Sequence, residues 1–152
     1  MPVNPNLYTL LVIEDNDGDV FLIRKAIEDY GIPAEMTVCS DGESALRLID
    51  SEHPPAVDAI ILDLAIPRIE GLDVLRTISN RPLWVDVPVM VFTSSPSPGD
   101  KHRVQLLGRA RYVEKPTSLD GFLREIGDNV SAMLSERQVR PVLEAALPTD
   151  SI

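Results

Sequence analysis

A short apolar stretch that ends in an acid constrains the fold of this chain more than any other feature. Residues 59–62 read Ala-Ile-Ile-Leu, and Asp63 follows them directly. Such a short run, rich in branched side chains, is typical of a strand buried on both faces of a parallel sheet. Pro67 prevents the strand from continuing, and Gly71 frees the backbone before a helical pattern over residues 72–78. The sequence therefore predicts a strand, a charged loop and a helix, with an acid where α/β sheets bind ligands.

The same alternation of strand and helix recurs along the whole chain. Apolar patterns predict strands over residues 7–13, 36–39, 59–62, 87–92 and 110–113, and helices over 17–30, 44–51, 72–78, 100–107 and 118–134. The apolar face of the first helix is expected to include Phe21, and the prolines and glycine of residues 96–99 predict a loop before the fourth helix. Five strands that alternate with five helices indicate an α/β fold with a doubly wound parallel sheet.

The size and charge of the chain argue against several classes of protein. Its 152 residues are the length of one domain, so we expect no second output domain. The formal net charge is -10, with 14 basic against 24 acidic residues, which disfavours binding to nucleic acid or to an anionic membrane. The single cysteine, Cys39, cannot form an internal disulfide, and we find no secretion leader and no membrane-spanning run. These features predict a cytoplasmic protein.

Four of the five predicted strands end in residues that can act on a phosphoryl group. These residues are the pair Glu14 and Asp15, then Asp63, Thr93 and Lys115. If the first strand is central, the carboxyl ends of these strands converge on one crevice. Two like charges about 4 Å apart repel by roughly 4 kcal/mol at an effective dielectric constant near 20, so three clustered carboxylates require a cation.

The ligand types indicate which cation to expect. Carboxylate and carbonyl oxygens suit Mg²⁺, whereas a zinc site would need histidine or cysteine, and His53 and His102 lie far from the strand ends in sequence. With Mg²⁺ bound, Asp63 could attack an activated phosphoryl group. Lys115 and the Thr93 hydroxyl would then stabilise charge on its oxygens.

Four motifs at these strand ends resemble the receiver domain of two-component response regulators. They are VIEDN at residues 12–16, ILDLAIPRIEG at 61–71, VFTSS at 91–95 and VEKP at 113–116, and the resemblance extends over residues 7–134. It implies a flavodoxin-like sheet of strand order 2-1-3-4-5. It also implies a switch that accepts phosphate, rather than a metabolic enzyme.

The resemblance assigns a metal site to the acidic residues. It implies that Asp15 and Asp63 bind Mg²⁺ together with the backbone carbonyl of Ala65, and that Glu14 acts through a metal-bound water. Ala65 stands where many members have a polar residue, which leaves the carbonyl ligand intact.

The resemblance also assigns the phosphoryl chemistry. Asp63 would receive a phosphoryl group from a phosphohistidine on a sensor histidine kinase, and Thr93 and Lys115 would bind that group. Tyr112, three residues before the lysine, occupies the place of the switch aromatic of the family. A buried aromatic of a strand, without a switching role, is the alternative for Tyr112.

The opening EDNDGDVFLIRKAI and a C-terminal segment with Leu-Pro are similar to single-domain regulators that work with bacterial phytochrome-type kinases. We expect a flexible arm over residues 1–6, a receiver domain over 7–135 and an extension over 136–152. The extension either folds back on its own domain or contacts a kinase or a second copy in a homodimer.

Two alternatives to the switch remain open from the sequence. A small Mg²⁺-dependent aspartyl phosphatase would use the same nucleophile, but such enzymes usually carry a second acid two residues after it, where this chain has Ala65. A phosphorylation-independent interaction module on the same fold is the other alternative.

Overall fold

The computed structural model describes residues 7–94, 97–108 and 110–146, with side chains up to residue 137. The arm expected over residues 1–6 lies outside this range. The strands are β1 (Tyr8–Ile13), β2 (Ala34–Cys39), β3 (Ala59–Leu62), β4 (Val89–Thr93) and β5 (Ala110–Glu114). The helices are α1 (Asp17–Asp29), α2 (Gly42–Ile49), α3 (Gly71–Asn80), α4 (Pro98–Leu106) and α5 (Leu119–Ala146).

The strands form one parallel sheet in the order β2-β1-β3-β4-β5, which confirms the predicted topology. Ile13, the last residue of β1, pairs with Cys39 of β2 on one side and with Leu62 of β3 on the other. Thr93 at the end of β4 pairs with Glu114 at the end of β5. Because the strands are parallel and in this register, the segments that follow β1, β3, β4 and β5 leave the sheet at the same edge.

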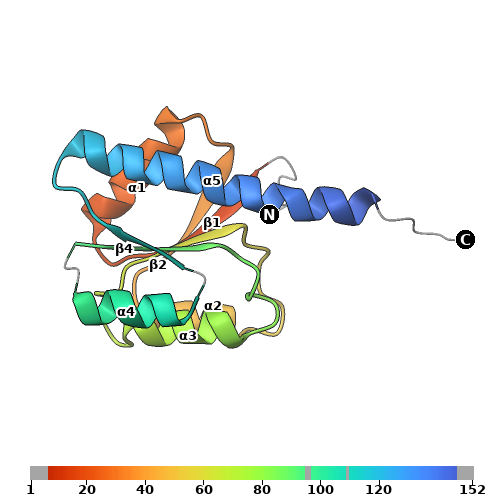
Figure 1. The fold of residues 1–152 in the computed structure, drawn as a ribbon, viewed down its shortest axis with the longest axis horizontal. Coiled ribbons are helices and arrows are strands. Elements are labelled where there is room, and N and C mark those ends of the chain that lie inside the picture. Colours follow the sequence, from red (N-terminus) through yellow and green to blue (C-terminus); the bar gives the residue numbers. More distant parts are fainter. Residues whose placement is uncertain (1–6, 95–96, 109, 147–152) are drawn as a thin grey trace, which may run out of the picture.

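The helices cover both faces of the sheet, and each face has its own apolar core (Figure 1). Helices α1 and α5 pack on one face against Leu10, Val12 and Ile61. Helices α2, α3 and α4 cover the other face, against Leu11 and Ile60. The three strands β1, β3 and β4 have apolar residues on both sides, which is why their sequences show continuous apolar runs rather than alternation.

Two local predictions were wrong. Helix α4 begins at Pro98 rather than Asp100, because the Ser97 hydroxyl accepts a hydrogen bond from the Asp100 N–H and proline is compatible with the first turn of a helix. Phe21 is 65% exposed and does not belong to the buried face of α1, which is formed by Ile23, Ala26 and Ile27.

Gly71 is required for a close approach of two backbones rather than for a special backbone angle. Its φ is not positive, and helix α3 begins at this residue. A Cβ atom here would lie 2.5 Å from the Leu64 Cα and 2.9 Å from the Asp63 carbonyl oxygen. The glycine therefore lets helix α3 start directly against the segment that carries Asp63.

Helix α5 continues past residue 136 and ends at Ala146, so the extension begins as a continuation of this helix (Figure 1). Its last turns run beyond the edge of the sheet. Residues 147–152 lie outside the described range, and the domain boundary after residue 135 stays a prediction. Over the described residues, we find no helix whose length and hydropathy would let it cross a lipid bilayer.

Candidate phosphoacceptor and metal site

Backbone hydrogen bonds of the sheet bring the candidate residues to one edge. The Asp63 N–H donates to the Ile13 carbonyl over 3.0 Å, so Asp63 follows β3 beside the end of β1. The Glu14 N–H donates to the Cys39 carbonyl over 3.0 Å, and the Lys115 N–H donates to the Thr93 carbonyl over 2.8 Å. Each of these residues thus extends its strand by one position. Their side chains lie at the edge formed by the carboxyl ends of the strands, which we call the rim of the sheet.

The ammonium of Lys115 joins the acids at the centre of this rim. Its Nζ lies 2.8 Å from Asp63 Oδ2 and 2.5 Å from Glu14 Oε1, and all three side chains are buried. The other oxygen of Asp63, Oδ1, accepts a hydrogen bond from the Ala65 N–H over 2.9 Å. Both oxygens of Asp63 are therefore fixed, one by a cation and one by the loop that follows.

Two pKa values at the rim are raised, for different reasons. Burial raises the pKa of the Glu14 carboxyl from 4.5 to about 7; the hydrogen bond from Lys115 opposes this shift, and the negative charge of Asp63 adds to it. Burial alone would lower the pKa of Lys115, but hydrogen bonds from its Nζ to Asp19, Asp63 and Glu14 outweigh burial and raise the pKa above its usual value. The lysine therefore stays charged, whereas Glu14 takes up a proton near neutral pH.

The acidic residues fit a divalent cation. One carboxylate oxygen each from Glu14, Asp15 and Asp63 lies within 4.8 Å of the other two. Two oxygens bound to one Mg²⁺ at about 2.1 Å lie roughly 3 to 4 Å apart, so small side-chain movements would complete such a site. Asp15 is exposed while Glu14 and Asp63 are buried, which leaves a solvent-facing side through which a hydrated ion can enter.

The raised pKa of Glu14 predicts a pH-dependent affinity for Mg²⁺. A cation favours the ionised carboxylate, so its binding must release the Glu14 proton when the pH is below about 7. We expect the affinity to fall about tenfold between pH 8 and pH 6. The raised pKa also affects the ion-free protein, because the folded state holds the Glu14 proton more tightly than the unfolded state does. The free energy of unfolding should therefore fall as the pH rises from 4.5 to about 7, and Glu14 should cause no further loss above pH 7.

Calorimetric Mg²⁺ titrations at several pH values measure this dependence. The Glu14→Gln variant, which has no titrating group at this position, is the matched control and should show a flatter profile. Equal slopes for the wild type and the variant would contradict the assignment.

The remaining candidates lie at the same edge or one strand away. Thr93 is buried at the end of β4, beside the strand that carries Lys115. Ala65 is exposed, two residues after Asp63. Tyr112 lies on β5, where it is half-buried and its Oη accepts a hydrogen bond from the Ser97 N–H over 3.4 Å. The hydroxyl of Tyr112 thus contacts the start of α4, not the acidic cluster.

Asp19 is a member of the site that sequence reasoning missed. Its Oδ2 lies 2.7 Å from Lys115 Nζ, as close as Asp63. A signal was present in the sequence, since Asp19 precedes the buried Ile23 by one helical turn and so lies on the inward face of α1. Asn16 caps this helix by accepting a hydrogen bond from the Asp19 N–H, so the Asp19 carboxylate is not needed as a cap.

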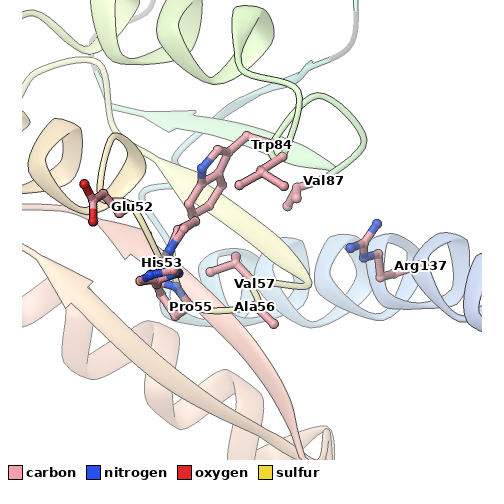
Figure 2. A pocket seen from close by; sticks show the side chains of 10 residues that line it. Glu52, His53, Pro55, Ala56, Val57, Trp84, Val87 and Arg137 are labelled. Carbon is pink, nitrogen blue, oxygen red and sulfur yellow. The ribbon is translucent and has the colours of Figure 1, made fainter.

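Two hollows in the surface differ in their position relative to this site. A depression of about 490 Å³ opens beside it and is lined by Asp19, Leu22, Ser94, Glu114, Lys115, Pro116, Thr117, Ser118, Leu119 and Phe122. A second hollow, of about 360 Å³, lies at the opposite edge of the sheet, before β3 and β4 (Figure 2). Its wall includes Trp84, which is buried and whose Nε1 donates to the Ile49 carbonyl over 3.0 Å. Only the first hollow reaches the charged cluster.

Comparison with known proteins agrees with this geometry. The chain matches the family model of the response regulator receiver domain over residues 10–126. It is 30% identical over 118 residues to the polar-differentiation response regulator DivK of Brucella ovis, covering 78% of this chain and 92% of DivK. It is 29% identical over 130 residues to the transcriptional regulatory protein PhoP of Bacillus subtilis, covering 86% of this chain but 50% of PhoP.

Solved structures show the same likeness. The phosphorylated cyanobacterial phytochrome response regulator RcpA superposes with a TM-score of 0.78 at 26% identity, covering 85% of this chain and 95% of RcpA. The Mn²⁺-bound form of the response regulator Rcp1 gives 0.77 at 25% identity, covering 84% and 94%. The bacteriophytochrome response regulator AtBRR gives 0.65 at 32% identity, covering 82% and 93%. With a buried acid, an acidic cluster and a lysine at the rim of a 2-1-3-4-5 sheet, this chain belongs to the response regulator receiver domains of two-component signalling.

Proposed function

We propose that Asp63 accepts a phosphoryl group from a phosphohistidine of a sensor histidine kinase, and that the modified domain acts as a switch. The contact of Lys115 Nζ with Asp63 Oδ2 is the observation that supports this role most strongly. In such a transfer this buried cation would lie beside the oxygens on which negative charge develops. Members of the receiver family take phosphoryl groups from histidine kinases.

The proposed transfer forms one bond and breaks one. An oxygen of Asp63 attacks the phosphorus atom, the P–N bond to the imidazole breaks, and its electron pair returns to the ring nitrogen. Lys115 and the hydroxyl of Thr93 would bind the equatorial oxygens of the phosphoryl group. Nothing is oxidised or reduced, and the product is a mixed anhydride on Asp63.

Mg²⁺ is the proposed cation of the site. Asp15, Asp63 and the carbonyl of Ala65 would hold it directly, and Glu14 would act through a bound water. This choice is supported by the carboxylate oxygens of Glu14, Asp15 and Asp63, which lie within 4.8 Å of one another. The Mn²⁺-bound form of the similar regulator Rcp1 also supports a divalent cation. The ion would neutralise charge between the carboxylates and the phosphoryl oxygens.

The proposed partner is a kinase of the bacterial phytochrome type. The similarity to the phytochrome response regulator RcpA and the bacteriophytochrome response regulator AtBRR supports this choice. We propose that the transfer takes place in the cytoplasm, where a kinase that uses ATP has its phosphodonor. The net charge of -10 favours protein partners over nucleic acid or anionic lipid.

Tyr112 and Thr93 are the proposed switch residues. The Tyr112 hydroxyl contacts Ser97, which caps α4, so a rotation of the ring would release this contact at the start of the helix. A phosphoryl group that draws the Thr93 hydroxyl inward would vacate space for the ring. NMR of Tyr112 during titration with beryllofluoride and Mg²⁺ measures this rotation; an unchanged environment would contradict the coupling.

The extension over residues 136–152 is a proposed contact arm for a kinase or a second copy of the chain. The continuation of α5 to Ala146, beyond the sheet, supports this role. The solution mass of the full chain, compared with that of a chain ending at residue 135, tests the homodimer. The homodimer would be contradicted if both chains have the mass of a monomer at micromolar concentration.

Incubation with acetyl phosphate and Mg²⁺, followed by intact mass measurement over time, separates the three candidate functions. A switch should show one phosphoryl adduct that persists after the donor is removed. A small phosphatase should turn over varied phosphoesters without a lasting adduct. A phosphorylation-independent module should show neither.

A further inference from the structure

The three N–H donors of Lys115 are all used, and one of them goes to a residue outside the predicted site. Two donors bind Glu14 and Asp63, which follow strands β1 and β3. The third binds Asp19 Oδ2 over 2.7 Å, from the first turn of helix α1. The cation that should bind a phosphoryl group is therefore shared among three carboxylates.

Asp19 is held firmly in this position. Its backbone N–H donates to the Asn16 side chain over 2.9 Å, which fixes the first turn of α1 at the rim of the sheet. Its side chain is 24% exposed, whereas that of Lys115 is 6% exposed. Both residues line the depression of about 490 Å³ beside the site. Asp19 is thus the more exposed partner of the buried lysine and lies with it at the wall of this depression.

We propose that Asp19 is a positioning residue that holds Lys115 over Asp63 and, through its charge, sets the balance between cation and phosphoryl binding. This inference rests on the proposed phosphoacceptor function. The hydrogen bond to Asp19 orients the ammonium. The negative charge of Asp19 favours the divalent cation and opposes a phosphoryl dianion.

Opposite effects on a cation and on an anion follow from Coulomb's law. Glu14, Asp19 and Asp63 bind a single ammonium, and a carboxylate oxygen of Asp15 lies within 4.8 Å of oxygens of Glu14 and Asp63. The cluster is therefore strongly negative when all four carboxylates are ionised. Removal of one negative charge must weaken the attraction for Mg²⁺ and reduce the repulsion of a phosphoryl group. A variant that merely disturbs the fold would weaken both.

Asp19→Asn tests the charge, because asparagine keeps the size of the side chain and an oxygen that can accept from Lys115. At a partly exposed site we expect the dissociation constant for Mg²⁺ to rise roughly three- to tenfold. At saturating Mg²⁺ we expect the rate of phosphorylation by acetyl phosphate to rise by a similar factor. Calorimetry measures the first quantity, and intact mass against time measures the second.

Asp17→Asn is the matched control. It removes the same charge from the same turn of α1, where the side chain of Asp17 is exposed and makes no hydrogen bond or ion pair with the rest of the described chain. We expect less than about a twofold change in either quantity, since exposed charges are screened. Weaker Mg²⁺ binding together with slower phosphorylation in Asp19→Asn, or changes no larger than in Asp17→Asn, would overturn the proposed charge balance.

Asp19→Ala tests the positioning role, because alanine removes both the charge and the acceptor. We expect the same loss of Mg²⁺ affinity as in Asp19→Asn, but slower phosphorylation than in Asp19→Asn. Equal or faster phosphorylation would show that the bond to Lys115 is not needed. If the wild type forms no adduct, the proposed function fails instead, and the Mg²⁺ titrations still report on the charge of Asp19.

Discussion

Replacement of Lys115 with methionine should destabilise the ion-free protein by about 3 to 5 kcal/mol at pH 8, the usual effect of removing one partner from a buried charge pair. Glu14 and Asp63 would then be buried, close together and without their cation. Protonation of Glu14 would relieve part of this repulsion, so the loss should be smaller at pH 5 than at pH 8. Urea unfolding at the two pH values measures it.

A saturating concentration of Mg²⁺ should restore much of the lost stability of Lys115→Met, because the ion replaces the missing positive charge. Lys101→Met, which removes an exposed lysine of α4, is the control and should unfold like the wild type. A wild-type-like stability of Lys115→Met without Mg²⁺ would show that the lysine does not compensate the buried acids.

The Asp63→Asn variant should form no phosphoryl adduct with acetyl phosphate and Mg²⁺. An amide oxygen carries no negative charge and is a poor nucleophile, and the variant also loses one acid of the cation site. We expect a decrease in the rate of labelling to the limit of detection, at least about a hundredfold, as for the removal of a covalent nucleophile.

Asp73→Asn is the control for this experiment, since Asp73 lies exposed on α3 and should be labelled like the wild type. Urea unfolding of Asp63→Asn checks that its fold is retained. A persistent adduct on Asp63→Asn would place the phosphoacceptor elsewhere.

The sheet and most of the site could be predicted because they depend on local patterns with a clear physical cause. Buried parallel strands must be apolar on both faces, so Leu10–Ile13 and Ala59–Leu62 are visible as continuous runs. The polar residue that ends each run is then placed by the register of the sheet. The approach of Glu14, Asp63 and Lys115 followed from this reasoning, and the structure shows it.

The features that the sequence did not reveal depend on contacts between distant segments or on the choice between two local conformations. The pattern around Pro98 and Gly99 fits both a loop and a first helical turn, and the hydrogen bond to Ser97 selects the helix. Gly71 is needed because the backbone of Leu64 passes next to it, which no local pattern reports. The contact of Asp19 with Lys115 joins residues 96 positions apart in the chain.

Chemical mapping of the phosphoryl group tests the central claim most directly. Borohydride reduces an aspartyl phosphate to homoserine, whereas it leaves a free carboxylate unchanged. Protein labelled with acetyl phosphate and Mg²⁺ should, after reduction and digestion, contain homoserine at residue 63 and at no other position. Homoserine at Asp15 or Asp19, or a label that borohydride leaves in place, would contradict the assignment of Asp63 as the phosphoacceptor.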